Sequence, residues 1–176
     1  MKAATLHQSG PRLNESRSDS GAVRISINAD ERAKIARSLS GLLADTYLLY
    51  LKTHQFHWNV TGPQFPVLHA LFETQYRALF EALDAVAERI RALGHYAPGT
   101  HREFTSLSSI QEDSMPMKAD AMIRRLLESH ETATRAAHQA FEIADAANDQ
   151  PTADLLTQRM QEHEKTAWIL RSMLEE

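Results

Sequence analysis

The strongest constraint on the fold is an amphipathic pattern that runs from Pro66 to Leu93. Apolar residues recur there at spacings of three, four and seven, which is typical of one buried stripe on an α-helix. These residues are Leu68, Leu71, Phe72, Leu79, Leu83, Val86 and Ala87. Turn-forming residues precede the pattern, and Pro66 suits a first helical turn. A long helix is therefore expected to begin near Pro66, and Gly94 is a suitable residue to end it.

Three further segments have the same helical periodicity. They are expected to form helices from Ala29 to His57, from Met117 to Ala147, and from about Thr152 onward. Asn28 and Glu31 have the spacing of an N-cap and its third helical residue, so they predict the start of the first of these helices. Ile35, Leu39, Leu42, Leu43, Leu49 and Leu51 are expected to form its apolar side.

The second and third long helices are joined by a linker that is too long for a tight hairpin. Phe104, Leu107 and Ile110 are expected to form one short helix within it. Four amphipathic helices with one long crossover predict an all-α four-helix bundle. Residues 25–176 are expected to form this single bundle domain, after a tail of residues 1–24.

The tail has little apolar periodicity and is rich in serine and glycine, which predicts a flexible segment. Its positive residues are Lys2, Arg12, Arg17 and Arg24, against the two acids Glu15 and Asp19. This net charge of about +2 binds phosphate weakly at physiological salt, although many such tails on one oligomer add by avidity. A solvated tail with no partner is the alternative.

Composition excludes several classes of protein. The 176 residues suit one domain, and with 43% apolar residues, six glycines and six prolines they favour a helical protein over a disordered one. Because cysteine is absent, the chain has no disulfides and no thiolate metal site. Neither a membrane span nor a secretory leader is evident, so a cytoplasmic location is expected. The net charge of -4 argues against a globally basic nucleic-acid binder.

Residues of metal-ligand type lie on the helix that follows Pro66. His69 and Glu73 are four residues apart and share a face, as do Asp84 and Glu88. His57 comes shortly before them. At about 1.5 Å per residue, however, His69 and Glu88 lie roughly 28 Å apart along the helix axis. One copy of the helix therefore cannot bring both pairs to one ion.

Two copies of the helix can solve this problem. If they pack antiparallel about a two-fold axis, His69 and Glu73 of one copy approach Asp84 and Glu88 of the other. Two equivalent sites then form across one interface. Two imidazoles and three carboxylates suit iron or another divalent first-row metal.

The same stretch resembles the ferroxidase signature of the Dps-type mini-ferritins, the starvation-induced DNA-protection proteins. The matching residues are His57-Trp58, Gly62-Pro63, Phe65, Leu68-His69, Glu73, Asp84 and Ala87-Glu88-Arg89. The resemblance covers the chain from about Asn28 to its C-terminus. It implies a ferritin-like four-helix bundle with a small helix in the long crossover between helices two and three.

The resemblance also implies a function. His57, His69, Glu73, Asp84 and Glu88 would bind Fe(II) between two subunits and oxidise it, preferentially with hydrogen peroxide. Fe(III) would then mineralise inside a shell of twelve copies, which would protect DNA from oxidative damage. DNA binding through the tail and a nucleoid location are further expectations. Trp58 would transfer electrons, although packing at an interface explains it equally well.

Asp145, Asp149 and Asp154 form an acidic group around the last turn between helices. In the family, aspartates near this position line the three-fold pores that admit iron. Ordinary helix-end chemistry is the alternative, with Asp154 in a first turn where the helix dipole favours an anion.

An intra-subunit di-iron site is disfavoured. Such sites use E-x-x-H pairs on two helices, and none of the nine histidines has a glutamate three residues before it. Two other classes of function remain open. The first is a DNA-compacting structural protein with a secondary metal site, and the second is a helical scaffold whose sites are inactive.

Overall fold

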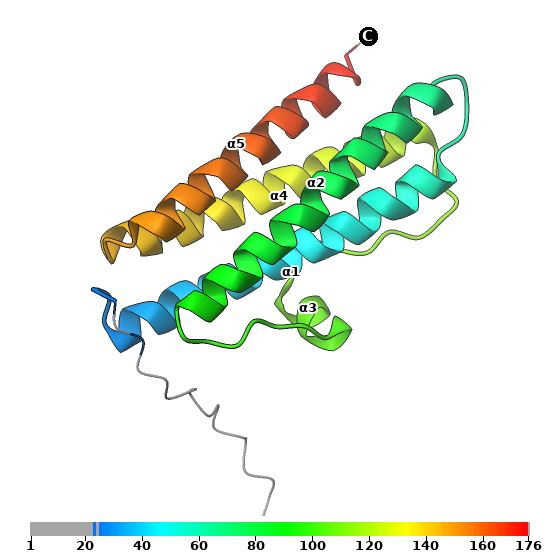
Figure 1. Cartoon of the computed structure of the whole chain (residues 1–176). Helices are drawn as coiled ribbons and strands as arrows, with labels where there is room; N and C mark the ends of the chain where they lie inside the picture. The colour runs from blue at the N-terminus through cyan, green and yellow to red at the C-terminus, as the bar shows by residue number, and fades with distance from the viewer. Residues whose placement is uncertain (1–22, 24, 176) are drawn as a thin grey trace, which may run out of the picture.

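The structure is a computed structural model that describes residue 23 and residues 25–175. It is all-helical over these residues, and its two helical hairpins, α1–α2 and α4–α5, are visible in Figure 1. The helices are α1 (Ala29–Asn59), α2 (Phe65–Ala92), α3 (His101–Leu107), α4 (Ala119–Ala146) and α5 (Gln150–Ser172). The tail residues Lys2, Arg12, Arg17 and Arg24 lie outside the described part of the chain.

The helix ends follow the local chemistry of the sequence. The Asn28 side chain accepts a hydrogen bond from the Glu31 N–H, and the Glu31 carboxylate accepts one from the Asn28 N–H, which confirms the capping box. After α2, Gly94 has a φ of 89°, a left-handed conformation that glycine adopts at no steric cost.

The core is built in two halves along the bundle. One half is centred on Leu68 and Phe72 of α2, and the other on Ile35 of α1 and Leu156 of α5. Four alanines on α4 (Ala133, Ala137, Ala140 and Ala144) are buried and allow its backbone to approach its neighbours closely. The sequence predicts Leu51 on the apolar side of α1, and this prediction is wrong, since Leu51 is 37% exposed.

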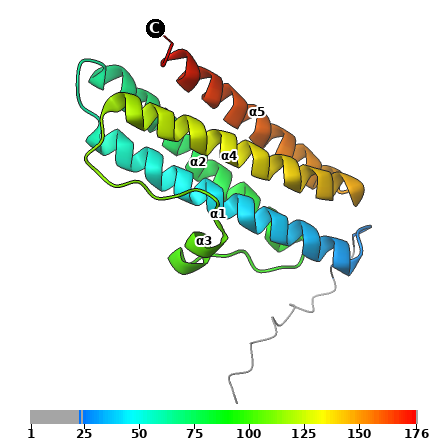
Figure 2. The same cartoon turned by 180° about the vertical axis from the view of Figure 1, so that it is seen from behind.

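The crossover carries the short helix α3 on the outside of the bundle, against α1 (Figure 2). The ring of Phe104 stacks on Tyr47 with 4.2 Å between centroids. The helix ends at Leu107. The prediction that Ile110 belongs to it is therefore wrong. Ile110 is nevertheless buried in the core, because the chain turns inward at Ser108.

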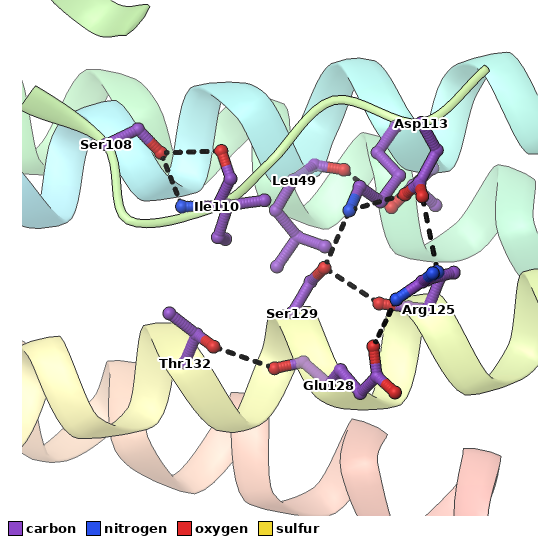
Figure 3. Close-up of polar contacts among 10 residues, drawn as sticks. Leu49, Ser108, Ile110, Asp113, Arg125, Glu128, Ser129 and Thr132 are labelled. Atoms are coloured by element: carbon purple, nitrogen blue, oxygen red, sulfur yellow. Dashed lines mark hydrogen bonds and ion pairs between the residues drawn. The ribbon is translucent and has the colours of Figure 1, made fainter. Parts of the chain in front are cut away.

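The second part of the crossover is held by charged groups (Figure 3). Asp113 pairs with the buried Lys52 of α1 at 2.7 Å and with Arg125 of α4 at 3.3 Å. Lys52 also donates to Ser129 of α4 at 3.1 Å. These contacts fix the crossover along α1 and α4, and with it the relative position of the two hairpins.

Packing among the four long helices is uneven. Extensive contacts join α4 to α5, α1 to α2 and α1 to α4, whereas α2 and α5 touch only sparingly. A cavity therefore remains between α2 and α5, with α4 at its base. In the described part of the chain, no helix has the length and apolar character needed to cross a bilayer.

Candidate metal centre at the start of helix α2

The structure brings together His57 at the end of α1 and His69 in the first turns of α2. Their rings stack with 3.8 Å between centroids and 20° between planes. A short turn through Gly62, whose φ is 106°, returns the chain so that the two helix ends lie side by side. His57 is buried and His69 is partly exposed.

Each of the two imidazoles is hydrogen-bonded to the backbone of the other residue. Nδ1 of His57 lies 2.8 Å from the carbonyl oxygen of His69, and Nδ1 of His69 lies 2.9 Å from the carbonyl oxygen of His57. A carbonyl oxygen only accepts, so both Nδ1 atoms carry the proton. With Nδ1 protonated, Nε2 is the ring atom whose lone pair can bind a metal ion, so the two Nε2 atoms are the candidate ligands.

Glu73 lies one turn after His69 on the same face of α2. Its carboxylate accepts hydrogen bonds from Arg77 at 2.5 and 3.1 Å. This contact lowers the pKa of Glu73, and the nearby His57 and His69 lower it further. Arg77 was not singled out from the sequence, although its i,i+4 spacing from Glu73 is the signal that predicts the pair.

Asp84 and Glu88 do not join this group. Both are exposed on α2, and about 22 Å of helix separates Glu88 from Glu73. Within the described residues of one chain, no three side chains of histidine, cysteine, aspartate or glutamate converge to hold a metal ion. The five predicted ligands are therefore divided into one histidine-containing half-site and one acidic half-site.

Aromatic side chains surround the histidine half-site. His54, one turn before His57, stacks on Tyr76 at 4.1 Å and lies 4.0 Å from the ring of Trp58. Burial, followed by the charge of His57, lowers the pKa of His54. Trp58 is 65% exposed. This face of the chain is thus unusually aromatic for an exposed surface.

The three aspartates near the α4–α5 turn have different environments. Asp149 is buried, pairs with Arg89 of α2 at 2.7 Å, and caps α5 by accepting from the Thr152 N–H. Asp154 is exposed and lies in the second turn of α5, so its expected place in the first turn is wrong. Asp145 is also exposed. Helix capping therefore accounts for Asp149.

Two relatives of this chain cover most of its length. A low temperature-induced protein of Nostoc sp. is 40% identical over 155 residues, which make up 87% of each protein. DNA protection during starvation protein 2 of Bacillus anthracis is 37% identical over 141 residues, covering 80% of this chain and 97% of that protein.

Solved structures agree with these sequence relatives. DpsC from Streptomyces coelicolor superposes with a TM-score of 0.87 at 27% identity, covering 94% of this chain and 97% of that chain. Dps from Vibrio cholerae, described as a ferritin-like diiron-carboxylate protein, superposes with a TM-score of 0.82 at 26% identity, covering 86% and 99%. Residues 37–176 match the Ferritin-like domain. The chain therefore belongs to the Dps-type mini-ferritins of the ferritin-like superfamily.

Proposed function

We propose that this protein is an iron-storage ferroxidase whose sites form between two subunits. The observation that carries the proposal is the divided ligand set on α2. The imidazoles of His57 and His69 lie beside Glu73, and their Nε2 atoms are not used in the hydrogen bonds to the backbone. Asp84 and Glu88 are exposed further along the same face of α2, too far away to bind the same ion within one chain. A second copy of α2, antiparallel to the first, completes both half-sites at once.

The surface of α2 between the half-sites supports this packing. The midpoint between the pairs His69–Glu73 and Asp84–Glu88 falls beside Phe80, whose ring is 62% exposed on that face. A groove of about 670 Å³ lies next to Asp84, and Phe80 and Leu83 line it together with Tyr47 and Phe104. An exposed phenylalanine beside an apolar groove is the self-complementary surface that a two-fold contact needs.

The chemistry of the completed site follows from its ligands. Fe(II) is the substrate, and each Fe(II) loses one electron. Hydrogen peroxide, the preferred oxidant, accepts one electron from each of two Fe(II) ions, and its O–O bond breaks to give two hydroxides. The carboxylates of Glu73, Asp84 and Glu88 stabilise the increased positive charge on iron. His57 and His69 complete the ligand set.

Storage requires an enclosed assembly. We place Fe(III) mineral inside a shell of twelve copies, as in the Dps-type proteins that the motif resembles. Asp145 and Asp154 are the exposed members of the acidic group and the candidates to line an entry pore, because Asp149 is buried, paired with Arg89 and caps α5. Trp58, which is exposed beside the histidine half-site, is positioned to supply or accept an electron. The location is the cytoplasm, close to the nucleoid.

A second candidate function is DNA binding through the tail of residues 1–24. The tail's net charge of about +2 and the relatives named for DNA protection favour it. Salt-dependent gel retardation that disappears when residues 1–24 are deleted would support it. If the deletion leaves retardation unchanged, the tail does not bind DNA.

An anaerobic Fe(II) titration followed by hydrogen peroxide tests the proposed ferroxidase. Absorbance of Fe(III) is monitored in the parent, Glu73→Gln and Asp84→Asn, with Glu142→Gln as the matched control because it removes an exposed carboxylate on α4. Fast oxidation in the parent and the control, with a loss of at least tenfold in both site variants, supports the proposal. Equal rates in all four proteins would contradict it.

A further inference from the structure

A second pair of histidines lies inside the bundle, away from the half-sites of α2. His130 of α4 and His163 of α5 are both 2% exposed, and their Nδ1 atoms face each other at 3.0 Å. Neither residue belongs to the family signature in the sequence. The Nε2 atoms of both rings are buried and have no hydrogen-bond partner.

Gln75 of α2 brings a third unpaired group to the same place. Its side-chain nitrogen and oxygen are both buried without a partner, and it lines one cavity together with His130 and His163. This cavity has a volume of about 340 Å³ and opens between α2 and α5. Buried polar atoms are almost always paired, and the three residues that carry these four unpaired atoms all line this one cavity.

The rings are in the form that binds metal ions. Burial lowers the pKa of His130 well below its usual value, and burial together with the charge of Arg159 lowers the pKa of His163 to about 4. Both imidazoles are therefore neutral near pH 7 and each carries one proton. One Nδ1 then donates to the other, and moving that proton to Nε2 frees both Nδ1 lone pairs for an ion without releasing a proton. Both Nε2 atoms then carry protons, so they are hydrogen-bond donors and not ligands of the ion.

The distance between the rings fits one shared ion. Two nitrogen ligands at about 2.0–2.1 Å from a tetrahedral ion are roughly 3.4 Å apart. The observed 3.0 Å between the Nδ1 atoms thus needs an increase of only about 0.4 Å. Side chains that line the cavity include Glu81, Glu162 and one basic group, Arg159, so its ionisable groups carry a net negative charge. Imidazole with amide oxygen and water suits a late first-row divalent ion.

We propose that His130 and His163 bind a divalent transition-metal ion within each subunit, with the Gln75 amide and water completing its coordination. No third histidine or carboxylate converges on the pair among the described residues, so water would take the coordination positions that the two imidazoles and the amide leave. It is complete within one chain, so it does not depend on the proposed ferroxidase or on its two-fold interface.

Zn(II) alone is the probe that tests this site. The protein carries His69→Gln, Glu73→Gln and Asp84→Asn to weaken the first site in both of its halves, and binding is measured by calorimetry on the intact oligomer. One Zn(II) per subunit is expected, with affinity at least tenfold weaker after His130→Gln or His163→Gln. His95→Gln serves as the control, because it removes a histidine remote from the cavity and should leave binding unchanged.

Crystals of the Zn(II)-soaked background protein give an independent readout that does not depend on the folding of the histidine variants. The expected result is an anomalous difference peak between the two rings. If the peak is absent, or if both histidine variants bind Zn(II) as the background protein does, the pair is a hydrogen-bonded element of the core and the proposed site does not exist.

Discussion

The histidine pairs His57–His69 and His130–His163 each bring two imidazole rings together, but the rings are hydrogen-bonded in different ways. In the first pair, backbone carbonyl oxygens hold both Nδ1 atoms at 2.8 and 2.9 Å. In the second pair, the Nδ1 atoms contact each other at 3.0 Å and the Nε2 atoms have no partner. The first pair lies where α1 ends and α2 begins, whereas the second lies in the interior between α4 and α5.

The partner of Nδ1 explains what each pair can do. A carbonyl oxygen fixes the proton on Nδ1, so the first pair offers two Nε2 ligands. In the proposed ferroxidase site, carboxylates of another chain join them. An imidazole partner leaves the proton shared, so the second pair can take an ion between its own rings. Burial keeps the second pair neutral, and its site is complete within one subunit.

The largest effect is expected from a substitution that breaks the proposed two-fold contact, because it should abolish metal binding at the first histidine pair and not at the second. In Phe80→Glu, a charge replaces the exposed ring at the centre of the proposed interface, so the dimer should dissociate. Fe(II) binding at the first pair should then be lost, while Zn(II) binding at the second pair remains. Native mass spectrometry and metal titrations measure both outcomes.

Trp168→Glu is the matched control for this prediction, since Trp168 is also 62% exposed but lies on α5. The two-fold dimer and its Fe(II) binding should survive that change. A dissociated Phe80→Glu protein that binds Fe(II) as tightly as the parent would show that the first pair does not need a second chain.

A second prediction concerns the position of α5, on which the buried pair depends. Asp149 caps α5 and pairs with Arg89 of α2, so Asp149→Ala leaves a largely buried charge without its partner. The free energy of unfolding should fall by about 3–5 kcal/mol. Chemical denaturation measures this, with Asp154→Asn as the exposed control, which should change it by less than about 0.5 kcal/mol. A small effect of Asp149→Ala would contradict its structural role.

The buried pair also predicts a pH dependence of stability in the presence of a chelator. His163 has a folded pKa of about 4, below the usual 6.5, because of burial and Arg159. The unfolded state therefore binds more protons between these values, and stability is complete above pH 6.5 and falls as the pH drops towards 4. The loss is about 3 kcal/mol. His163→Gln should make the denaturation midpoint less dependent on pH between pH 7 and 4, and the remaining dependence should include the contribution of the buried His130. An unchanged dependence on pH would oppose this account.

The smallest expected effect is at the first pair. Arg77 holds Glu73 and lowers its pKa, so it competes with a metal ion for that carboxylate. Arg77→Gln should raise the pKa of Glu73 and tighten Fe(II) binding by about two- to fivefold at neutral pH. Anaerobic Fe(II) titration measures this, with the exposed Arg135→Gln as the control. Weaker binding would mean that Arg77 positions Glu73 productively.

The helices and their ends were largely predictable because their determinants are local. Asn28 and Glu31 set the start of α1, Gly94 follows α2, and the apolar stripes define the buried faces. The prediction for Leu51 is wrong because residue type alone does not tell which side of a helix packs against neighbouring elements. Its 37% exposure depends on where neighbouring elements pack.

Contacts between distant segments were not predictable in the same way. Arg89 and Asp149 are 60 residues apart, and His130 and His163 are 33 residues apart on different helices. The E-x-x-H spacing identifies only sites built from that motif, and His130 and His163 belong to no such motif. One signal was available, because both histidines lie in the apolar stripes of their helices.

The most direct test of the shared ferroxidase site mixes two inactive variants. His69→Gln/Glu73→Gln subunits lack the histidine half-site, and Asp84→Asn/Glu88→Gln subunits lack the acidic half-site. Each assembles alone without an intact site, but a mixed two-fold dimer contains one intact site and one doubly altered site. Co-assembly of equal amounts should restore Fe(II) oxidation to about one quarter of the parent rate. If the mixture is as inactive as its components, the ligands of α2 are not shared between two chains.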